Sequence, residues 1–211
     1  VAPNTVIREL AYLSSVINHA RREWGINTPN PVQMVRKPPT PQGRNRVITK
    51  EEIQVLLEQL EPIDRRSIWM KPLVILAVET AMRRGELLQL RWTDINLQNR
   101  TATLWVTKNG DRRIVPLSMK AVDTLRSMPK SLCGALFPIS KAAQSKAFKE
   151  ALKRSNLVDV HFHDLRHTAI TNMSRKLPNV IELAAVSGHK SLKMLQRYYH
   201  PDAVELAAKL G

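Results

Sequence analysis

One segment of this chain differs in pattern from everything around it, and it limits the fold most. Residues 94–117 contain two short runs that alternate or are rich in β-branched residues, 102–107 and 112–115, with Asn109-Gly110 between them. Asn-Gly between two such runs is a strong hairpin signal. Apolar residues recur at helical spacing through most of the remaining chain. The sequence therefore predicts a mainly α fold with a small antiparallel three-stranded β-sheet.

The N-terminal part of the chain reads as a fragment of a helical domain followed by a linker. Residues 5–24 carry apolar side chains at helical spacing and end at Gly25, whereas residues 27–46 are rich in Pro, Arg, Lys and Asn. A single amphipathic helix needs a partner for its apolar stripe. We therefore expect residues 1–40 to be the closing remnant of a helical domain and residues 41–48 to be a basic linker.

A second domain is expected over residues 49–211. It begins at Thr49-Lys50-Glu51-Glu52, which has the pattern of a capping box at a helix N-terminus. Helical spacing of apolar residues then predicts nine helices, over residues 50–60, 66–83, 85–90, 118–128, 140–155, 163–177, 179–186, 191–199 and 202–209.

The charge of the chain points to a polyanionic partner. It has 33 Lys and Arg residues against 18 Asp and Glu residues, a formal net charge of +15. Nucleic acid is the first candidate, although a basic protein can also simply be basic. Cys133 is the single cysteine, which excludes an intrachain disulfide and a thiolate metal cluster. With no stretch long and apolar enough for a membrane span and no signal-peptide pattern, we expect a cytoplasmic protein.

Three polar clusters could carry chemistry: residues 80–87 (TAMRRGEL), residues 163–167 (HDLRH), and residues 188–200, which begin with Gly-His and end with Tyr-Tyr-His. Arg83 is expected to close a strongly apolar helix just before Gly85, because cations are favoured at helix C-termini. The alternative for Arg83 is a solvated or capping side chain.

A zinc site is an alternative interpretation of the second cluster. His163 and His167 lie four residues apart on a predicted helix, a spacing that can bind zinc. Arg166 would place a fixed positive charge beside the metal, and Asp164 would reach poorly as a general base. We therefore expect no metal, and a satisfied structural histidine remains an alternative for His167.

Helical geometry separates the two adjacent tyrosines. Leu192, Leu195 and Tyr199 fall on one apolar face of the predicted helix. Tyr199 is therefore expected to pack. Tyr198 lies about 100° around the helix and beside Arg197, so it can face a ligand.

In this order and at these intervals, the clusters resemble the catalytic domain of the tyrosine recombinases, the phage integrase family. The resemblance runs from about Ile48 to the end of the chain. Arg83 matches the family's Thr-Gly-x-Arg-x-x-Glu-Leu motif, in which it is the first catalytic arginine. His163 and Arg166 match His-x-x-Arg, and His189 matches Leu-Gly-His.

The resemblance also assigns the nucleophile and a mobile lysine. Tyr198 occupies the nucleophile position, and Lys108 matches the lysine of the family's hairpin. Ala81 stands where the family usually has glycine, and Ser187 where it usually has leucine. Residues 1–40 look like the end of the family's core-binding domain, and residues 49–211 like its catalytic domain.

The resemblance implies a site-specific recombinase that cuts and rejoins DNA through a 3′-phosphotyrosine, without metal, ATP or another cofactor. Arg83, Arg166 and His189 would donate hydrogen bonds to the phosphate oxygens as negative charge builds on them. His163 would take the phenolic proton of Tyr198, and Lys108 would protonate the leaving 5′-oxygen.

Acidic and basic neighbours of these residues are given supporting roles. Glu86, Asp164 and His200 are expected to orient the arginines and histidines, although Glu86 and Asp164 could instead cap or solvate helices. Basic residues in and before the linker are expected to contact the DNA backbone: Arg36, Lys37, Arg44 and Arg46.

The expected partner is double-stranded DNA, with a homotetramer on DNA, a monomer when free, accessory DNA-bending proteins and no membrane. Two alternatives stay open. A type IB topoisomerase forms the same covalent link but relaxes DNA, and a DNA-binding regulator would keep the scaffold without turnover.

Overall fold

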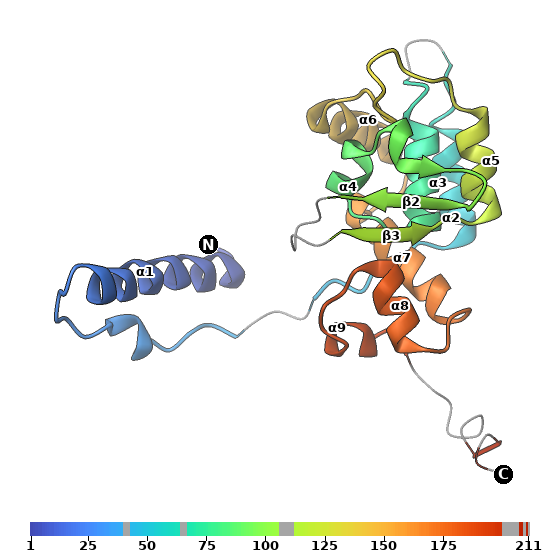
Figure 1. The fold of residues 1–211 in the computed structure, drawn as a ribbon. Coiled ribbons are helices and arrows are strands. Elements are labelled where there is room, and N and C mark those ends of the chain that lie inside the picture. The colour runs from blue at the N-terminus through green and yellow to red at the C-terminus, as the bar shows by residue number, and fades with distance from the viewer. Residues whose placement is uncertain (40–42, 64–66, 106–111, 200–206, 209, 211) are drawn as a thin grey trace. The chain divides into compact units, whose positions relative to one another are not determined.

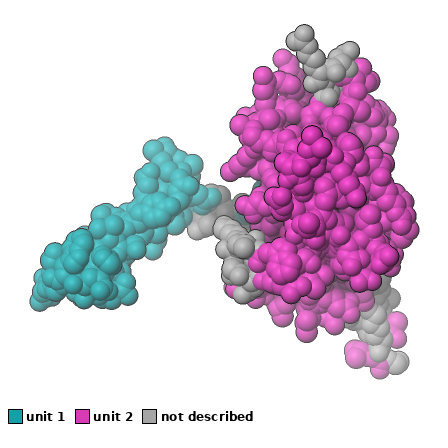
Figure 2. All heavy atoms as spheres, turned by 45° about the horizontal axis from the view of Figure 1, so that its top comes forward, with its two compact units in different colours: residues 1–44 teal, residues 45–211 magenta. Residues whose placement is uncertain are grey.

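The structure is a computed structural model that describes residues 1–39, 43–63, 67–105, 112–199, 207–208 and 210. It forms two compact units, Val1–Arg44 and Asn45–Gly211, which Figure 2 colours separately. The division between them falls inside the predicted linker, residues 41–48. Among the described residues, no helix has both the length and the apolar character needed to cross a membrane.

The first unit is built on the helix α1 (Pro3–Glu23), close to the predicted range. Asn30 holds the chain that follows against this helix. Its Nδ2 donates to Ser14 Oγ at 2.8 Å and to Asn18 Oδ1 at 3.0 Å. The short 3₁₀ turn η1 (Pro31–Gln33) comes next.

The second unit begins with α2 (Lys50–Glu58), and the predicted capping box is confirmed. Thr49 Oγ1 accepts the backbone N–H of Glu52 at 3.2 Å, and Glu52 Oε2 accepts the backbone N–H of Thr49 at 2.9 Å. Just before the cap, the buried backbone N–H of Ile48 donates to Thr168 Oγ1 at 2.9 Å. That bond ties the start of this unit to a helix 120 residues further on.

The central helix of the second unit is α3 (Met70–Thr80), which is strongly apolar and packs against helices on several sides. It ends at Thr80 because Ala81 adopts a left-handed conformation with a φ of 54°. A left-handed residue stops the helical hydrogen-bond ladder. The predicted single helix over 66–83 is therefore too long, because α3 begins only at Met70 and ends at Thr80.

The three-stranded antiparallel sheet is confirmed, with the order β1 (Ile95–Asn96), β2 (Thr101–Leu104) and β3 (Arg113–Pro116). Ala102 pairs with Val115, and both side chains are buried. The predicted turn at Asn109-Gly110 lies outside the described residues, as does Lys108.

The remaining helices are α4 (Arg84–Gln89), α5 (Met119–Ser127), α6 (Lys141–Arg154), α7 (Phe162–Ser174), α8 (Val180–Ser187) and α9 (Lys193–Gln196), with a 3₁₀ turn η2 (Trp92–Asp94) after α4. Four of them, α4, α5, α6 and α7, pack against α3, and α8 and α9 lie below the sheet in Figure 1. Polar side chains at Ser118, Ser140 and Asn179 accept a backbone N–H and so cap α5, α6 and α8. Helix α8 packs beside β3, and α3 packs along α7.

Helix α9 (Lys193–Gln196) is shorter than predicted. Helix α9 covers four residues, whereas the apolar spacing predicts a helix over 191–199. Tyr198 and Tyr199 follow in tight turns, with their backbone N–H groups donating three residues back to Leu195 and Gln196. This segment packs on a small second core that includes Ile170, Leu183 and Leu195. The predicted helix over 202–209 falls almost entirely outside the described residues.

Candidate active site

Arg83 begins α4 rather than ending α3. Its backbone N–H donates to Glu86 Oε2 at 2.8 Å, and its Nη1 donates to Glu86 Oε1 at 2.7 Å. Its Nη2 reaches the carbonyl oxygen of Gly188 at 3.4 Å. The expectation that Arg83 closes the preceding helix is wrong, because the left-handed Ala81 already stops that helix. Its neighbour in the turn, Glu86, caps α4 and orients the guanidinium at the same time.

Glu86 also holds a second arginine that the sequence analysis missed. Arg113, from β3, donates from Nη2 to Glu86 Oε2 at 2.9 Å and from Nη1 to the carbonyl oxygen of Ser187 at 3.0 Å. Both side chains are nearly buried. Strand alternation could have found Arg113, because it is two residues from the buried Val115 and so shares its face.

Arg113 also explains why a glycine stands at position 188. Gly188 ends α8 with a φ of +69°, a conformation that glycine adopts easily. A Cβ at this position would lie 1.5 Å from Arg113 Nη1. Any side chain at Gly188 would therefore displace Arg113 from the Ser187 carbonyl.

Arg166 is the most buried of the three arginines Arg83, Arg113 and Arg166, with 4% of its surface exposed. Its Nη2 donates to the carbonyl oxygen of Ser187 at 2.7 Å, and its Nη1 donates to the carbonyl oxygen of Ala81. The pKa of Arg166 is lowered to about 10, by burial first and then by the charge of Arg83. It therefore stays protonated at neutral pH.

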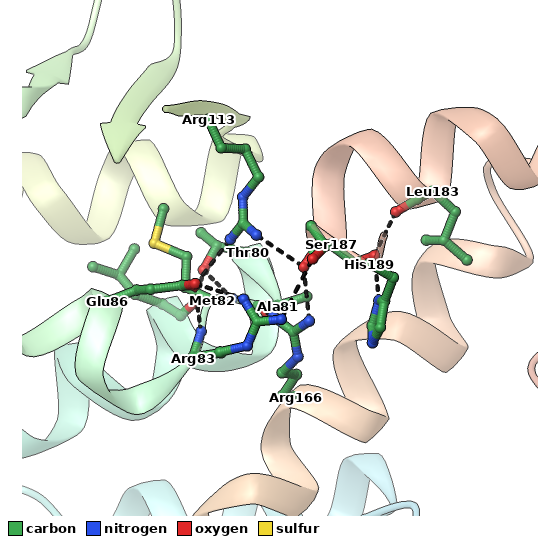
Figure 3. A network of polar contacts seen from close by, with 12 residues as sticks. Thr80, Ala81, Met82, Arg83, Glu86, Arg113, Arg166, Leu183, Ser187 and His189 are labelled. Carbon is green, nitrogen blue, oxygen red and sulfur yellow. Dashed lines mark hydrogen bonds and ion pairs between the residues drawn. The ribbon is translucent and has the colours of Figure 1, made fainter. Parts of the chain in front are cut away.

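The end of α8 thus collects three guanidinium groups, as Figure 3 shows. Arg113 and Arg166 share the Ser187 carbonyl, and Arg83 approaches the Gly188 carbonyl. Helix C-termini carry unpaired carbonyls and a partial negative charge, so they attract cations. This geometry brings two residues of distant motifs, Arg83 and Arg166, to one place.

His189 joins the cluster through Ser187. Its Nδ1 lies 2.7 Å from Ser187 Oγ, whose hydroxyl donates to the carbonyl of Leu183 at 2.6 Å. A serine hydroxyl has one hydrogen, so Nδ1 of His189 must donate, and its Nε2 is the nitrogen left for a ligand. The pKa of His189 is lowered to about 4 by burial first and then by Arg166 and Arg83. Serine in place of the family's usual leucine supplies this bond.

Tyr198 meets a histidine, but a different one from the one expected. Its phenolic oxygen lies 2.5 Å from Nδ1 of His167, while His163 packs edge-on against the His167 ring at a centroid distance of 5.0 Å. The pKa of Tyr198 is raised by burial, although the charges of Arg197 and Arg166 oppose that rise. The sequence pattern indicated only a zinc ligand or a structural residue at His167, so this contact with Tyr198 is new.

Tyr199 packs, as expected from the apolar face. It contacts the second core, and its hydroxyl donates to the carbonyl oxygen of Leu177 at 2.6 Å. The helical geometry used to separate the two tyrosines does not hold, because α9 ends before both of them. Tertiary contacts therefore orient the pair.

The other predicted site residues are placed as follows. Asp164 is fully buried and accepts the backbone N–H of His161 at 2.7 Å, so it caps α7. Arg36 and Lys37 are exposed in the first unit, and Arg46, in the second, pairs with Glu52. Lys108 and His200 lie outside the described residues.

A groove of about 740 Å³ opens beside the cluster, between α4, α6 and α7. Arg83, His163 and Arg166 line it together with Lys141 and Lys149. Within the part of the chain that the structure describes, no three His, Cys, Asp or Glu side chains gather as metal ligands would. The arginine, lysine and histidine side chains that line the groove present nitrogen donors, which suit a phosphate.

Comparison of this sequence with known proteins points to one family. The model of the phage integrase family matches residues 46–205. The shufflon-specific DNA recombinase of Escherichia coli is 44% identical over 211 residues, which are 100% of this chain and 54% of that protein. A putative integrase/recombinase of Haemophilus influenzae is 32% identical and covers 100% of this chain, which spans 71% of it. This chain therefore spans about half the length of the first of these relatives.

Solved structures share the fold. The Tn1549 transposon integrase, in complex with a circular intermediate DNA, superposes with a TM-score of 0.76 at 17% identity, covering 100% of this chain and 79% of that one. A lambda integrase dimer bound to a COC′ core site has a TM-score of 0.71 at 25% identity, covering 93% of this chain and 61% of that one.

Proposed function

Because the chain belongs to the phage integrase family, we propose that it cleaves and rejoins double-stranded DNA in site-specific recombination, with Tyr198 forming a 3′-phosphotyrosine. One observation carries the proposal. Arg83, Arg166 and His189 converge at the end of α8. The phenolic oxygen of Tyr198 contacts His167 on α7, the helix that also carries Arg166.

The cationic cluster suits a phosphodiester under attack. Negative charge builds on the non-bridging oxygens in the transition state, and planar guanidinium groups can donate paired hydrogen bonds to them. Arg83 and Arg166 are held by Glu86 and by backbone carbonyls, so their positions are set before DNA arrives. Preorganised donors of this kind stabilise charge without reorganisation during the reaction.

His189 would contribute through Nε2, because its Nδ1 is used by Ser187. Nε2 donates a hydrogen bond only when the imidazole is protonated. Burial and the neighbouring arginines lower the pKa of His189 to about 4 in the absence of DNA. An incoming phosphate anion opposes that charge repulsion and favours the protonated, donating form.

The covalent step stores the energy of the phosphodiester. The phenolic oxygen of Tyr198 attacks phosphorus and the 5′-oxygen of the next nucleotide leaves, so rejoining needs no ATP. A 5′-alkoxide is a poor leaving group, and Lys108, by its place in the hairpin motif, is the proposed acid that protonates it. Attack by a different 5′-hydroxyl completes recombination.

The proposed partners follow from the same reaction. Exchange between two duplexes requires four cleavages, so a homotetramer on DNA is proposed, assembled from chains that are monomers when free and helped by accessory DNA-bending proteins. Exposed Arg36 and Lys37, and the linker residues Arg44 and Arg46, would contact phosphates and fix position without reading sequence.

A pool of nicked DNA tests the proposal whatever the sequence of the target site. Duplexes with a randomised segment carry a nick, so that cleavage releases a short oligonucleotide and traps the covalent complex. We expect a protein–DNA adduct that survives denaturant, enriches one sequence and forms in excess EDTA.

Matched variants complete the test. Tyr198→Phe should abolish the adduct, and Tyr199→Phe should largely spare it. Loss of the adduct in Tyr199→Phe alone would refute the assignment of the nucleophile. Specific binding without any adduct would favour a non-catalytic regulator, and relaxation of supercoiled plasmid without strand exchange would favour a topoisomerase.

A further inference from the structure

The contact between His167 and Tyr198 holds the phenol in place, but it has so far been given no role in proton transfer. Nδ1 of His167 lies 2.5 Å from the phenolic oxygen of Tyr198, and the two rings are tilted by 30° with centroids 6.1 Å apart. The oxygen it contacts is the one that would attack DNA. His167 therefore touches the reacting atom itself.

The surroundings of His167 set the direction of this hydrogen bond. The pKa of His167 is lowered to about 4 by burial first and then by His163 and Arg197, so the imidazole is neutral at pH 7. The pKa of Tyr198 is raised, so the phenol keeps its proton. A neutral imidazole has one lone pair free, and the phenol can donate to it at Nδ1.

Charged and titratable groups approach His167 from three elements. They are His163, Asp164 and Arg166 on α7, His189 after α8, and Arg197 after α9. The cations among them disfavour imidazolium in the free protein. A bound phosphate diester would offset the charge of Arg166 and so raise the pKa of His167 towards the working pH.

We propose that His167, rather than His163, is the base that takes the phenolic proton of Tyr198 during attack on DNA. This inference rests on the proposed function. His163 lines the groove together with Arg83 and Arg166, the two arginines proposed to bind the phosphate. His167 lies on the next turn of the same helix, against the nucleophile.

The proton and electron balance is closed within the reaction. As the Tyr198 O–H bond breaks, the proton passes to Nδ1 of His167, the phenolic oxygen bonds to phosphorus, and the bond to the 5′-oxygen breaks. That oxygen leaves with a proton from a separate acid, for which Lys108 is proposed. In rejoining, a 5′-hydroxyl attacks phosphorus and passes its proton to the deprotonated acid, proposed to be Lys108. The bond from phosphorus to the phenolic oxygen breaks, and the His167 imidazolium returns its proton to that oxygen.

The test measures single-turnover adduct formation between pH 5 and 9, on a nicked duplex selected from the pool above. His167→Ala should slow it at pH 7 by about 10²- to 10⁴-fold, the usual contribution of a general base. The rate of adduct formation by His167→Ala should rise about tenfold for each unit increase in pH, because without a base only the ionised phenol reacts. The rate of the wild-type chain should rise only up to the pKa of His167 in the DNA complex and level off above it, because the imidazole is then neutral and able to take the proton. His167→Asn should be as slow as His167→Ala, because an amide can accept the hydrogen bond but not the proton.

Replacing Tyr198 with a difluorotyrosine, which has a more acidic phenol, distinguishes the two histidines. It should restore much of the lost rate in His167→Ala and little in His163→Ala. DNA binding by each variant, measured by mobility shift, shows that it is folded.

Three results would overturn the inference while leaving the proposed function intact: a wild-type rate for His167→Asn, a pH profile of His167→Ala parallel to wild type, or rescue confined to His163→Ala. A wild-type chain that forms no adduct would overturn the proposed function and this inference with it.

Discussion

Replacing Glu86 by glutamine removes one negative charge from the centre of the site with almost no change of shape. Glu86 is 6% exposed and pairs with Arg83 at 2.7 Å and with Arg113 at 2.9 Å. Removing one partner of a buried pair usually costs about 3–5 kcal/mol. Glutamine keeps an oxygen for the Arg83 backbone N–H, so we expect about 3 kcal/mol, the lower end of that range.

Thermal and urea unfolding measure this loss directly. In a unit of this size, a loss of about 3 kcal/mol lowers the melting temperature by about 6–12 °C. Glu150→Gln, the same chemical change on the exposed face of α6, is the matched control and should stay within about 0.5 kcal/mol of wild type. A Glu86→Gln chain as stable as this control would refute the view that the arginine cluster depends on Glu86.

The pH dependence gives a second check on the same variant. Burial alone would raise the pKa of Glu86. The hydrogen bond from the Arg83 backbone N–H and the charges of Arg113 and Arg83 outweigh burial, so the pKa of Glu86 is lowered below its usual value of 4.5. A lowered pKa contributes stability that is complete above the unfolded pKa and is lost as the pH falls through the folded pKa. The difference between wild type and Glu86→Gln should therefore be largest near pH 7 and shrink below about pH 4.5. A difference independent of pH would contradict this assignment.

Three further outcomes are expected. Thr168→Val leaves the buried N–H of Ile48 without its acceptor and should lower the free energy of unfolding by about 1–3 kcal/mol in urea titrations; a loss below about 0.5 kcal/mol would contradict this. Arg113→Lys cannot reproduce the paired contact with Glu86 and the Ser187 carbonyl, so adduct formation should slow about tenfold. DNA affinity should stay nearly unchanged. An unchanged rate of adduct formation would count against a positioning role for Arg113. Gly188→Ala should slow the adduct at least as much, because its Cβ displaces Arg113, and a normal rate would show that this contact is dispensable.

The helical content, the capping box at Thr49 and the antiparallel sheet could all be predicted, because each depends on short-range patterns. The end of α3 could not. Alanine rarely adopts a positive φ, so Ala81 gave no local sign of a break, whereas the glycine usual in the family would have given one. The displaced helix end moves Arg83 from a C-terminus to an N-terminus without disturbing its meeting with Glu86.

The site was predictable where motifs carried it and hidden where tertiary contacts decided it. The order of the clusters pointed to Arg83, Arg166, His189 and Tyr198, and the structure brings the first three together at the end of α8. The role of Arg113 depends on the packing of β3 beside α8, and that of His167 depends on where the segment after α9 turns back. Strand alternation indicates that Arg113 faces inward with Val115, but neither its partner nor the partner of His167 leaves a periodic signal along the chain.

Mass spectrometry of the trapped complex tests the central claim most directly. After nuclease and protease digestion of the adduct, the peptide that retains a nucleotide remnant identifies the attached residue. We predict attachment through a 3′-phosphate to the phenolic oxygen of Tyr198. A nucleotide found on Tyr199, on Tyr12 or on any serine would contradict the account.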